Sequence, residues 1–150
     1  MSFAKKIIVA VDFTNEINNL LKDMKEMSFI AGSEIQFVHV ASKITYSFVF
    51  SNMPLVYPVE EDRKTIEEST IASLVKLSKE VLPENFSGKV RHLCFFSENP
   101  KQTFVEYVNA ENPDLVIVAT RLRKGLFESS FAHYVDKNTK ANMLLIKHHD

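Results

Sequence analysis

The sequence predicts a doubly wound α/β domain, in which helices cover both faces of an open parallel sheet. Five short apolar runs alternate along the chain with segments whose apolar residues recur at helical spacing. The chain has only three glycines in 150 residues, and no repeat, low-complexity tract or linker divides it. Because that length suits one domain with one core, we expect a single domain over residues 1–150.

The first part of the chain reads as strand, helix, strand. Ile7–Val11 is an apolar run typical of a strand buried on both faces. From Thr14 to Ala31 apolar residues recur at helical spacing, with Thr14 as N-cap and Gly32 as the stop, which predicts an amphipathic helix. Ile35–Val40 is the second apolar run. This order predicts a parallel pair joined by a right-handed crossover.

An aromatic stretch, Tyr46–Tyr57, follows the second predicted strand. Pro54 and Pro58 exclude a long helix there, and the segment is too apolar for a flexible linker. Two interpretations stay open: a loop that covers the core of the sheet itself, or a loop that binds a partner or covers a ligand.

The second part of the chain continues the alternation to its end. An acidic start suits the positive end of a helix dipole, and prolines mark where one helix ends and another begins. The predicted elements are a helix over 60–81, a strand over Lys89–Phe96, a helix over 100–111, a strand over Leu115–Ala119, a polar, basic loop over Thr120–Gly125, a helix from Leu126 to about Lys140, and a strand over Met143–Ile146.

Composition excludes several classes of partner. A formal net charge of −1 gives no surface for a polyanion, so we expect no nucleic acid. The apolar run Ile7–Val11 is far shorter than the ~20 residues of a membrane span, and no signal-peptide pattern surrounds it. The single cysteine, Cys94, lies in an apolar run and is expected to be a buried thiol in a reducing compartment. We therefore expect a cytoplasmic protein that does not bind membranes.

Several chemistries lack the residues they require. No G-x-G-x-x-G follows the first strand, and no G-x-x-x-x-G-K-[ST] is present. Asp12 stands alone where a phosphorylated receiver domain needs clustered acids, and one cysteine cannot form C-x-x-C. No nucleophile with a base, metal-ligand spacing or paired carboxylates indicates an active site, so we predict that the chain is not an enzyme. A small-molecule enzyme on the same fold stays a third hypothesis, which predicts turnover that is lost on Asp12→Ala.

Three segments together resemble the universal stress protein family. They are K-K-I-I-V-A-V-D-F-T over residues 5–14, I-Q-F-V-H-V over 35–40, and D-L-V-I-V-A-T-R-L-R-K-G-L-F-E-S-S-F-A-H-Y-V over 114–135. The resemblance implies a sheet in the order 3-2-1-4-5, of the adenine nucleotide alpha hydrolase-like type. It also implies a homodimer through the last strand, Met143–Ile146. In one branch of the family it implies ATP held by a G-2x-G-9x-G-[ST] loop.

The sequence departs from that family motif at every small or hydroxyl-bearing position. Ala119 and Leu122 stand at the first two glycines, and Ala132 and His133 stand at the Gly-[Ser/Thr] pair. Glycine lets backbone amides approach phosphate, whereas the branched side chain of Leu122 obstructs that approach. We therefore predict that ATP is not bound in the usual way and that no cofactor is required.

The adenosine half of the family site is better preserved. Asp12 and Val40 match the positions that contact ribose and adenine in the family, although Asp12 could equally cap the turn after its strand. Arg121 belongs to an R-L-R-K cluster that, with His133, could contact an anion or lie solvated. The candidate nucleotide-binding residues are therefore Asp12, Val40, Ala119, Arg121, Leu122, Ala132 and His133.

The leading functional hypothesis is a dimeric regulatory or stress-response module that acts by association, with an unknown protein partner left open. The alternative is an adenine-nucleotide sensor with slow or no hydrolysis. His39 and His92 lie within strand runs and are interpreted as structural. His148, His149 and Asp150 could ligate a metal, but a chain end usually frays, so we predict no metal site.

Overall fold

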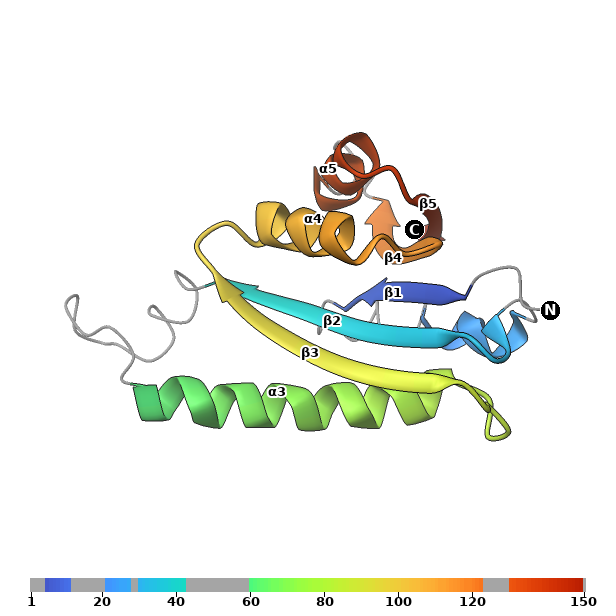
Figure 1. Ribbon diagram of the computed structural model, residues 1–150, viewed down its shortest axis with the longest axis horizontal. Helices are drawn as coiled ribbons and strands as arrows, with labels where there is room; N and C mark the ends of the chain where they lie inside the picture. The colour runs from blue at the N-terminus through green and yellow to red at the C-terminus, as the bar shows by residue number, and fades with distance from the viewer. Residues whose placement is uncertain (1–4, 12–20, 28–29, 43–59, 123–129, 150) are drawn as a thin grey trace.

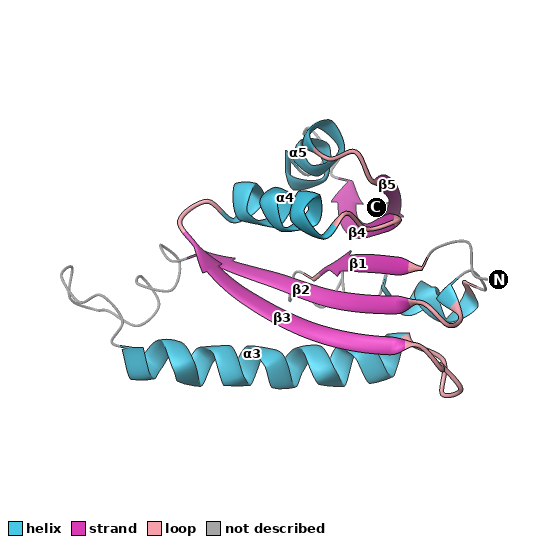
Figure 2. Ribbon diagram, in the orientation of Figure 1, coloured by secondary structure: helices cyan, strands magenta, loops and turns pink. Residues whose placement is uncertain are grey.

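The computed structural model describes residues 5–11, 21–27, 30–42, 60–122 and 130–149. It contains a five-stranded sheet in the order β3-β2-β1-β4-β5, in which every neighbouring pair is parallel (Figures 1 and 2). The predicted fold class and strand order are confirmed. The strands are β1 (Lys6–Ala10), β2 (Glu34–Ser42), β3 (Lys89–Ser97), β4 (Leu115–Leu122) and β5 (Asn142–His149).

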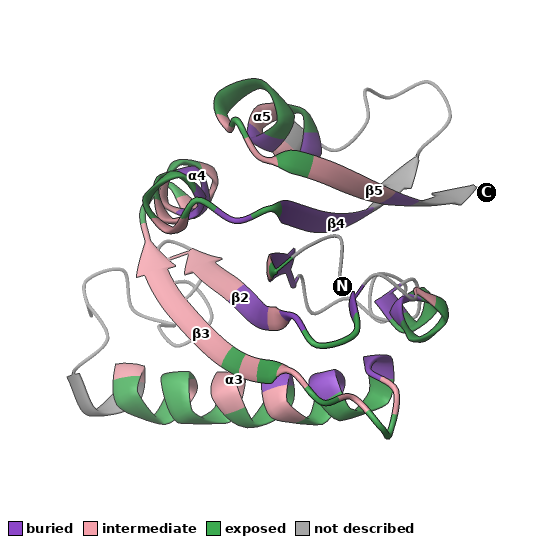
Figure 3. Ribbon diagram, turned by 45° about the vertical axis from the view of Figure 1, so that its right-hand side comes forward, coloured by how far each residue is buried: buried purple, intermediate pink, exposed green. Residues whose placement is uncertain are grey.

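Helices cover both faces of this sheet. The short 3₁₀ helix η1 (Lys22–Glu26) and α3 (Glu60–Val81) pack on one face, and α4 (Pro100–Glu111) and α5 (Ser130–Asn138) lie on the other (Figure 1). The described residues of β1 and β4 form the buried centre, whereas β3 is only partly buried (Figure 3). Within the described ranges no helix has the length and apolar character of a membrane span.

Helix α4 matches its sequence prediction at both ends. Pro100 occupies the first turn, and Asn99 caps the helix by accepting a hydrogen bond from the Gln102 N–H at 3.4 Å. Asn112 ends it in the left-handed region at φ 49°. These local signals explain why the prediction of residues 100–111 is confirmed.

In its described part, the predicted helix over residues 14–31 is α-helical at Leu21 but not beyond it. Lys22–Glu26 forms a 3₁₀ helix, and Met27 is extended at φ −90° and ψ 103°. The buried side chains of Leu21, Met24 and Ile30 are spaced by threes or sixes, and a 3₁₀ helix has three residues per turn. Gly32, with φ 76°, is the stop that the sequence predicts. Residues 14–20 lie outside the described residues.

Other element boundaries also differ from the prediction. β2 and β5 are longer than predicted, ending at Ser42 and His149. The last strand is in register with β4 as far as His149, three residues beyond its predicted end at Ile146. The described part of the last helix is Ser130–Asn138, and residues 126–129 and the aromatic stretch 46–57 lie outside the described residues.

Cys94 is half-buried, not fully buried as expected. Burial raises the pKa of its thiol to about 11. The thiol is therefore protonated and unreactive at neutral pH.

His92 joins β3 to α3 through a half-buried side chain. Its Nε2 lies 2.9 Å from Ser78 Oγ, and that hydroxyl donates to the Val75 carbonyl at 2.7 Å. Because the hydroxyl proton is already used, Nε2 donates to Ser78. The ring also stacks on Phe37, with centroids 6.0 Å apart. These contacts fit the interpretation of His92 as structural.

The stability of the protein should fall at mildly acidic pH because of this histidine. Burial lowers the pKa of His92 below the ordinary value of about 6.5. A lowered folded-state pKa adds stability above the unfolded value, and this stability is lost as the pH falls below it. We expect the free energy of unfolding to decrease from about pH 7 to pH 5, and less steeply in His92→Gln, which keeps a donor toward Ser78. Urea unfolding across this range measures both slopes, and equal slopes would contradict the expectation.

Candidate functional site

The carboxyl ends of β1 and β4 meet where the strand order reverses. The chain runs outward from β1 to β2 and β3, then returns to the other side of β1 as β4. Ala10 is the last residue of β1 and pairs with Val38 of β2 and Val118 of β4. Ligands of open α/β sheets bind outside the carboxyl ends of the strands at such a reversal. This edge of the sheet is therefore the candidate site.

Val11, the residue before Asp12, is hydrogen-bonded to β2 through both its N–H and its carbonyl. Asp12 itself lies outside the described residues, but its neighbour Val11 is only 5% exposed. The Val11 N–H donates to the Val38 carbonyl at 2.9 Å, and the Val11 carbonyl lies 2.8 Å from His39 Nδ1. Because a carbonyl oxygen only accepts, Nδ1 carries the proton. These two bonds fix the exit from β1.

The sequence predicts Val40 as the last residue of the second strand. In the structure it lies within β2, which continues to Ser42. It is half-buried and pairs with Phe95 of β3. The strand continues beside β3 as far as the Ser42 and Ser97 pair, although β1 has already ended. Backbone groups of alternate residues point to the same side of a strand, so those of Val40 face the β1 side, as those of Val38 do. Val40 thus borders the exit from β1.

The predicted loop Thr120–Gly125 is wrong for its first three residues. β4 continues to Leu122, and Thr120–Leu122 is in register with Lys147–His149 of β5. Pairing with β5 extends the strand through this segment although it lacks the continuous apolar run from which the strands were predicted. This segment contains the second glycine position of the family motif. Its backbone groups that face β5 are therefore used in hydrogen bonds to that strand.

Side chains fill two of the other motif positions. Ala119 is 7% exposed and packs with Ile117 in the core on the α3 face. Ala132 of α5 is 4% exposed and packs with Phe104 in the core on the α4 face. His133, the next residue, is exposed. The two methyl groups thus occupy core positions in place of bare glycine backbone.

The predicted site residues fall into separate groups. Val40 lies on the β2 side of the exit from β1, whereas Ala119, Arg121 and Leu122 belong to β4. Ala132 and His133 lie on α5. Their roles toward a ligand stay predictions.

A metal centre gains no support from the described part of the chain. It contains no group of three or more His, Cys, Asp or Glu residues able to hold an ion. His148 and His149 are consecutive residues of β5, in register with Arg121 and Leu122.

The sequence interpretation missed one side chain at this edge. His39 was taken as structural, yet its imidazole bonds the last carbonyl before Asp12. The available signal was a polar side chain near the end of an otherwise apolar strand run.

The sequence and fold place this chain in a family. The sequence model of the universal stress protein family matches residues 4–147, so the chain belongs to that family. A search of the curated proteins finds no match to this sequence.

Solved structures share the fold. The hypothetical protein PH0823 aligns with a TM-score of 0.74 and 22% identity, over 97% of each chain. A universal stress protein in complex with cAMP aligns with a TM-score of 0.63 and 11% identity, over 96% of this chain and 97% of that one. The universal stress protein from Archaeoglobus fulgidus in complex with dAMP aligns with a TM-score of 0.59 and 16% identity, over 95% of this chain and 97% of that one.

Proposed function

We propose that the protein is a regulatory module of the universal stress protein family that works as a dimer, without turnover and without the usual binding of ATP. Its partner is a second copy of the chain. The near-neutral charge and the single, half-buried thiol support action in the cytoplasm rather than at a membrane or on nucleic acid.

The observation that carries this proposal is the course of β4. In the ATP-binding branch of the family, glycines leave backbone amides free to hold phosphates. Here the corresponding segment is a strand paired with β5 as far as Leu122, and the Ala119 and Ala132 methyl groups are buried. A triphosphate would have to displace the backbone groups that pair with β5, or the packed Ala119 and Ala132 side chains.

Nucleotide content of the purified protein tests this proposal. We expect no nucleobase absorbance in the supernatant after denaturation and no thermal shift on adding ATP with Mg²⁺. Stoichiometric co-purifying ATP, or stabilisation that grows with ATP concentration as mass action requires, would contradict it.

The dimer is supported by the difference between the two edge strands. Lys89 and Arg91 are exposed on β3, and charged side chains discourage edge pairing. On β5 the side chains described after Asn142 are apolar: Ile146 is buried, but Met143, Leu144 and Leu145 are only partly covered. A free apolar edge invites pairing with another chain, and a two-fold arrangement satisfies both copies at once.

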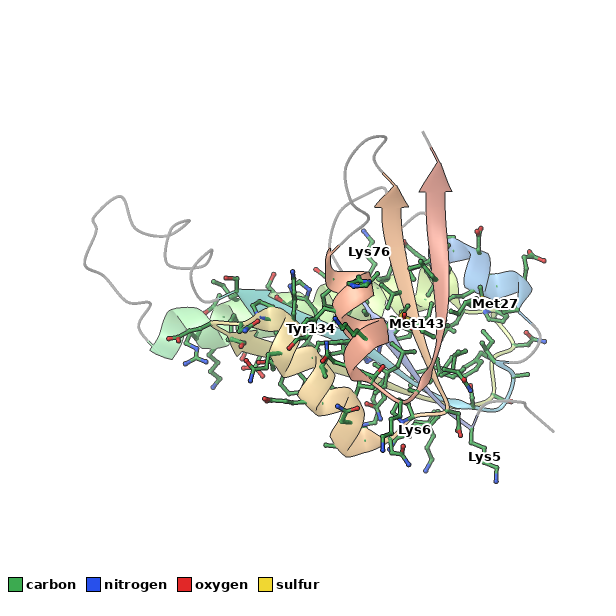
Figure 4. The ribbon with its side chains drawn as sticks, turned by 90° about the horizontal axis from the view of Figure 1, so that it is seen from above. Lys5, Lys6, Met27, Lys76, Tyr134 and Met143 are labelled. Carbon is green, nitrogen blue, oxygen red and sulfur yellow. The ribbon has the colours of Figure 1, made fainter. Side chains whose placement is uncertain are left out.

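A matched pair of methionine variants tests the dimer edge. Met143 lies on β5 and packs against the core on the α4 face, whereas Met27 follows η1 and packs against the core on the α3 face; each is half-buried (Figure 4). We expect a dimeric wild type, a monomeric Met143→Lys and a dimeric Met27→Lys in light scattering coupled to size exclusion. A monomeric wild type, or a Met143→Lys variant that stays dimeric, would contradict the proposed interface.

A second candidate function is an adenine mononucleotide sensor with slow or no hydrolysis. Two proteins with this fold were solved with cAMP and dAMP, ligands that need no triphosphate cradle. In this chain Val11, at the exit from β1, is hydrogen-bonded to β2 through its N–H and its carbonyl. Calorimetric titration with AMP and cAMP, with GMP as control, tests the candidate. Saturable binding of the adenine nucleotides alone supports it, and no binding eliminates it.

A further inference from the structure

The register of the sheet identifies which backbone groups of the edge strand β3 point away from it. Val38 of β2 bonds to β1, because its carbonyl accepts from the Val11 N–H. Successive residues of a strand direct their backbone groups to opposite sides, so those of His39 face β3. In a parallel pair, only one residue of each aligned pair directs its groups at the other strand. Cys94 is aligned with His39, so its N–H and carbonyl point outward.

The same alternation adds Val90 and His92 to Cys94, which gives three outward-facing residues at every second position. The outward groups of these three form no hydrogen bond within the described ranges of the chain. β3 is nine residues long, contains no proline and stays in register with β2 along its whole length at the margin of the sheet (Figure 1). A long, regular edge of this kind is a template for pairing with another chain.

Both faces of β3 are already covered in part by helices of this chain. On the α3 face, the His92 ring lies 2.9 Å from the Ser78 hydroxyl. On the α4 face, Leu93 belongs to the core, and the Phe95 ring packs on Tyr107 with centroids 5.1 Å apart. No residue of β3 is fully buried, however. Because β2 takes the inner edge, the surface left uncovered lies toward the outer edge.

Two cations precede two apolar side chains on one face of this strand. Lys89 and Arg91 are exposed and share the α4 face with Leu93 and Phe95, since alternate residues of a strand point the same way. Arg91 lies 3.7 Å from Glu111, whereas Lys89 has no ion pair with any described residue. Such charges discourage indiscriminate pairing but attract a segment with acidic side chains.

We propose that the outer edge of β3, residues 90–94, binds an extended segment of a different protein as a sixth strand of the sheet. The backbone of the segment pairs with the outward groups, its acidic side chains lie beside Lys89 and Arg91, and its apolar side chains lie beside the apolar pair that follows. The choice of a different protein rests on the proposed dimer, because copies that paired at both β3 and β5 would extend the sheet without end.

A short synthetic peptide tests this edge. End-capped Val-Thr-Val-Thr-Asp-Thr-Asp, antiparallel to β3, places its valines beside Phe95 and Leu93 and its aspartates beside Arg91 and Lys89. Its threonines then stand opposite the outward-facing residues. In NMR titrations of the labelled protein we expect saturable shifts centred on the amides of residues 90–94.

Modified peptides separate backbone pairing from nonspecific contact. N-methylation of the threonines removes the N–H groups that face β3 and should weaken binding at least about tenfold. N-methylation of the second valine and the first aspartate, whose N–H groups point away from β3, should weaken it less than about threefold.

A matched pair of lysine variants tests the charge. The peptide with aspartates should bind about tenfold more tightly than one with lysines in their place. This preference should fall about threefold in Lys89→Ala and stay unchanged in Lys79→Ala, at an exposed site on α3.

Three results would overturn the proposal: no saturable shifts in β3, shifts confined to β5, or equal binding of the two N-methylated peptides. Light scattering of the same samples tests the dimer separately. A monomeric protein with these β3 shifts keeps the edge site and rejects the dimer alone, whereas a dimer without them rejects the edge site alone. Dissociation of the dimer by the peptide would show that a second copy occupies β3, and would also overturn the proposal.

Discussion

Replacing Gly88 with alanine should cost about 3 kcal/mol or more of unfolding free energy, the largest effect expected of any single methyl group in this protein. A Cβ at Gly88 would stand 1.9 Å from the Ser33 carbonyl oxygen and 2.6 Å from the Phe86 ring. The ring can turn aside, but the carbonyl belongs to a buried residue whose own N–H bonds to Ile30 at 3.1 Å. Lys89 and Glu34, the next residues, begin the pairing of β3 with β2. The methyl group would therefore force the two strands apart where their ladder starts.

Gly32→Ala is the matched control for this prediction. Gly32 has φ 76°, which disfavours a side chain, but a Cβ there would meet nothing within 4 Å. Its cost should be only the backbone strain of about 1–2 kcal/mol. Urea unfolding of both variants compares the two costs, and a Gly88→Ala variant as stable as Gly32→Ala would show that the β2 and β3 backbones do not approach as described.

Replacing Glu111 with alanine should cost about 2 kcal/mol, because it removes the centre of a polar network under α4. Glu111 Oε1 accepts from Gln36 Nε2 at 3.1 Å, and Gln36 is fully buried in β2. The Tyr107 hydroxyl donates to Gln36 Oε1 and lies 3.3 Å from Glu111 Oε1. Lys6 Nζ and Arg91 Nη1 lie 3.6 Å and 3.7 Å from the same carboxylate oxygen. Without Glu111 the buried Gln36 amide loses its acceptor.

The titration of this network follows from the same contacts. The Gln36 hydrogen bond, with the Lys6 charge, lowers the pKa of Glu111. Burial, with the Glu111 charge, raises the pKa of Tyr107 to about 12. Glu111 therefore adds stability above its unfolded pKa of about 4.3, and this stability is lost as the pH falls through its lower folded value.

Two further variants separate the buried hydrogen bond from the ion pairs. Glu111→Gln keeps an acceptor for Gln36 but removes the charge, and should cost less than about 1 kcal/mol because Lys6 and Arg91 are partly exposed. Glu106→Ala, on an exposed site of the same helix, should cost under about 0.5 kcal/mol. An equal loss in Glu111→Ala and Glu106→Ala, measured by urea unfolding, would refute the role of the network.

Local signals explain which parts of the fold were predictable. Proline, an Asn cap and a left-handed Asn define α4, and continuous apolar runs define the two central strands. The end of the first helix, Lys22–Glu26, was misjudged because apolar residues spaced by threes fit a 3₁₀ turn as well as an α-helix. The partners of the buried Gln36 could not be predicted, since Tyr107 and Glu111 are distant from it in sequence.

The location of the candidate site could be predicted from the sequence, but its backbone structure could not. The order of elements located it at the carboxyl ends of the strands, and the substituted glycines indicated a changed phosphate loop. The extension of β4 to Leu122 could not be read from T-R-L, because pairing with β5 creates it. The contact of His39 with Val11 depends on the register of β1 and β2, which the sequence does not state.

Backbone amide mapping with ATP and Mg²⁺ tests the central claim that β4 is closed to a triphosphate. In two-dimensional NMR spectra of the labelled protein, we expect the amides of Ala119–Leu122 and of Ala132 and His133 to keep their positions as ATP is added. Saturable shifts confined to these amides would mean that phosphates reach the backbone there, and would contradict the account.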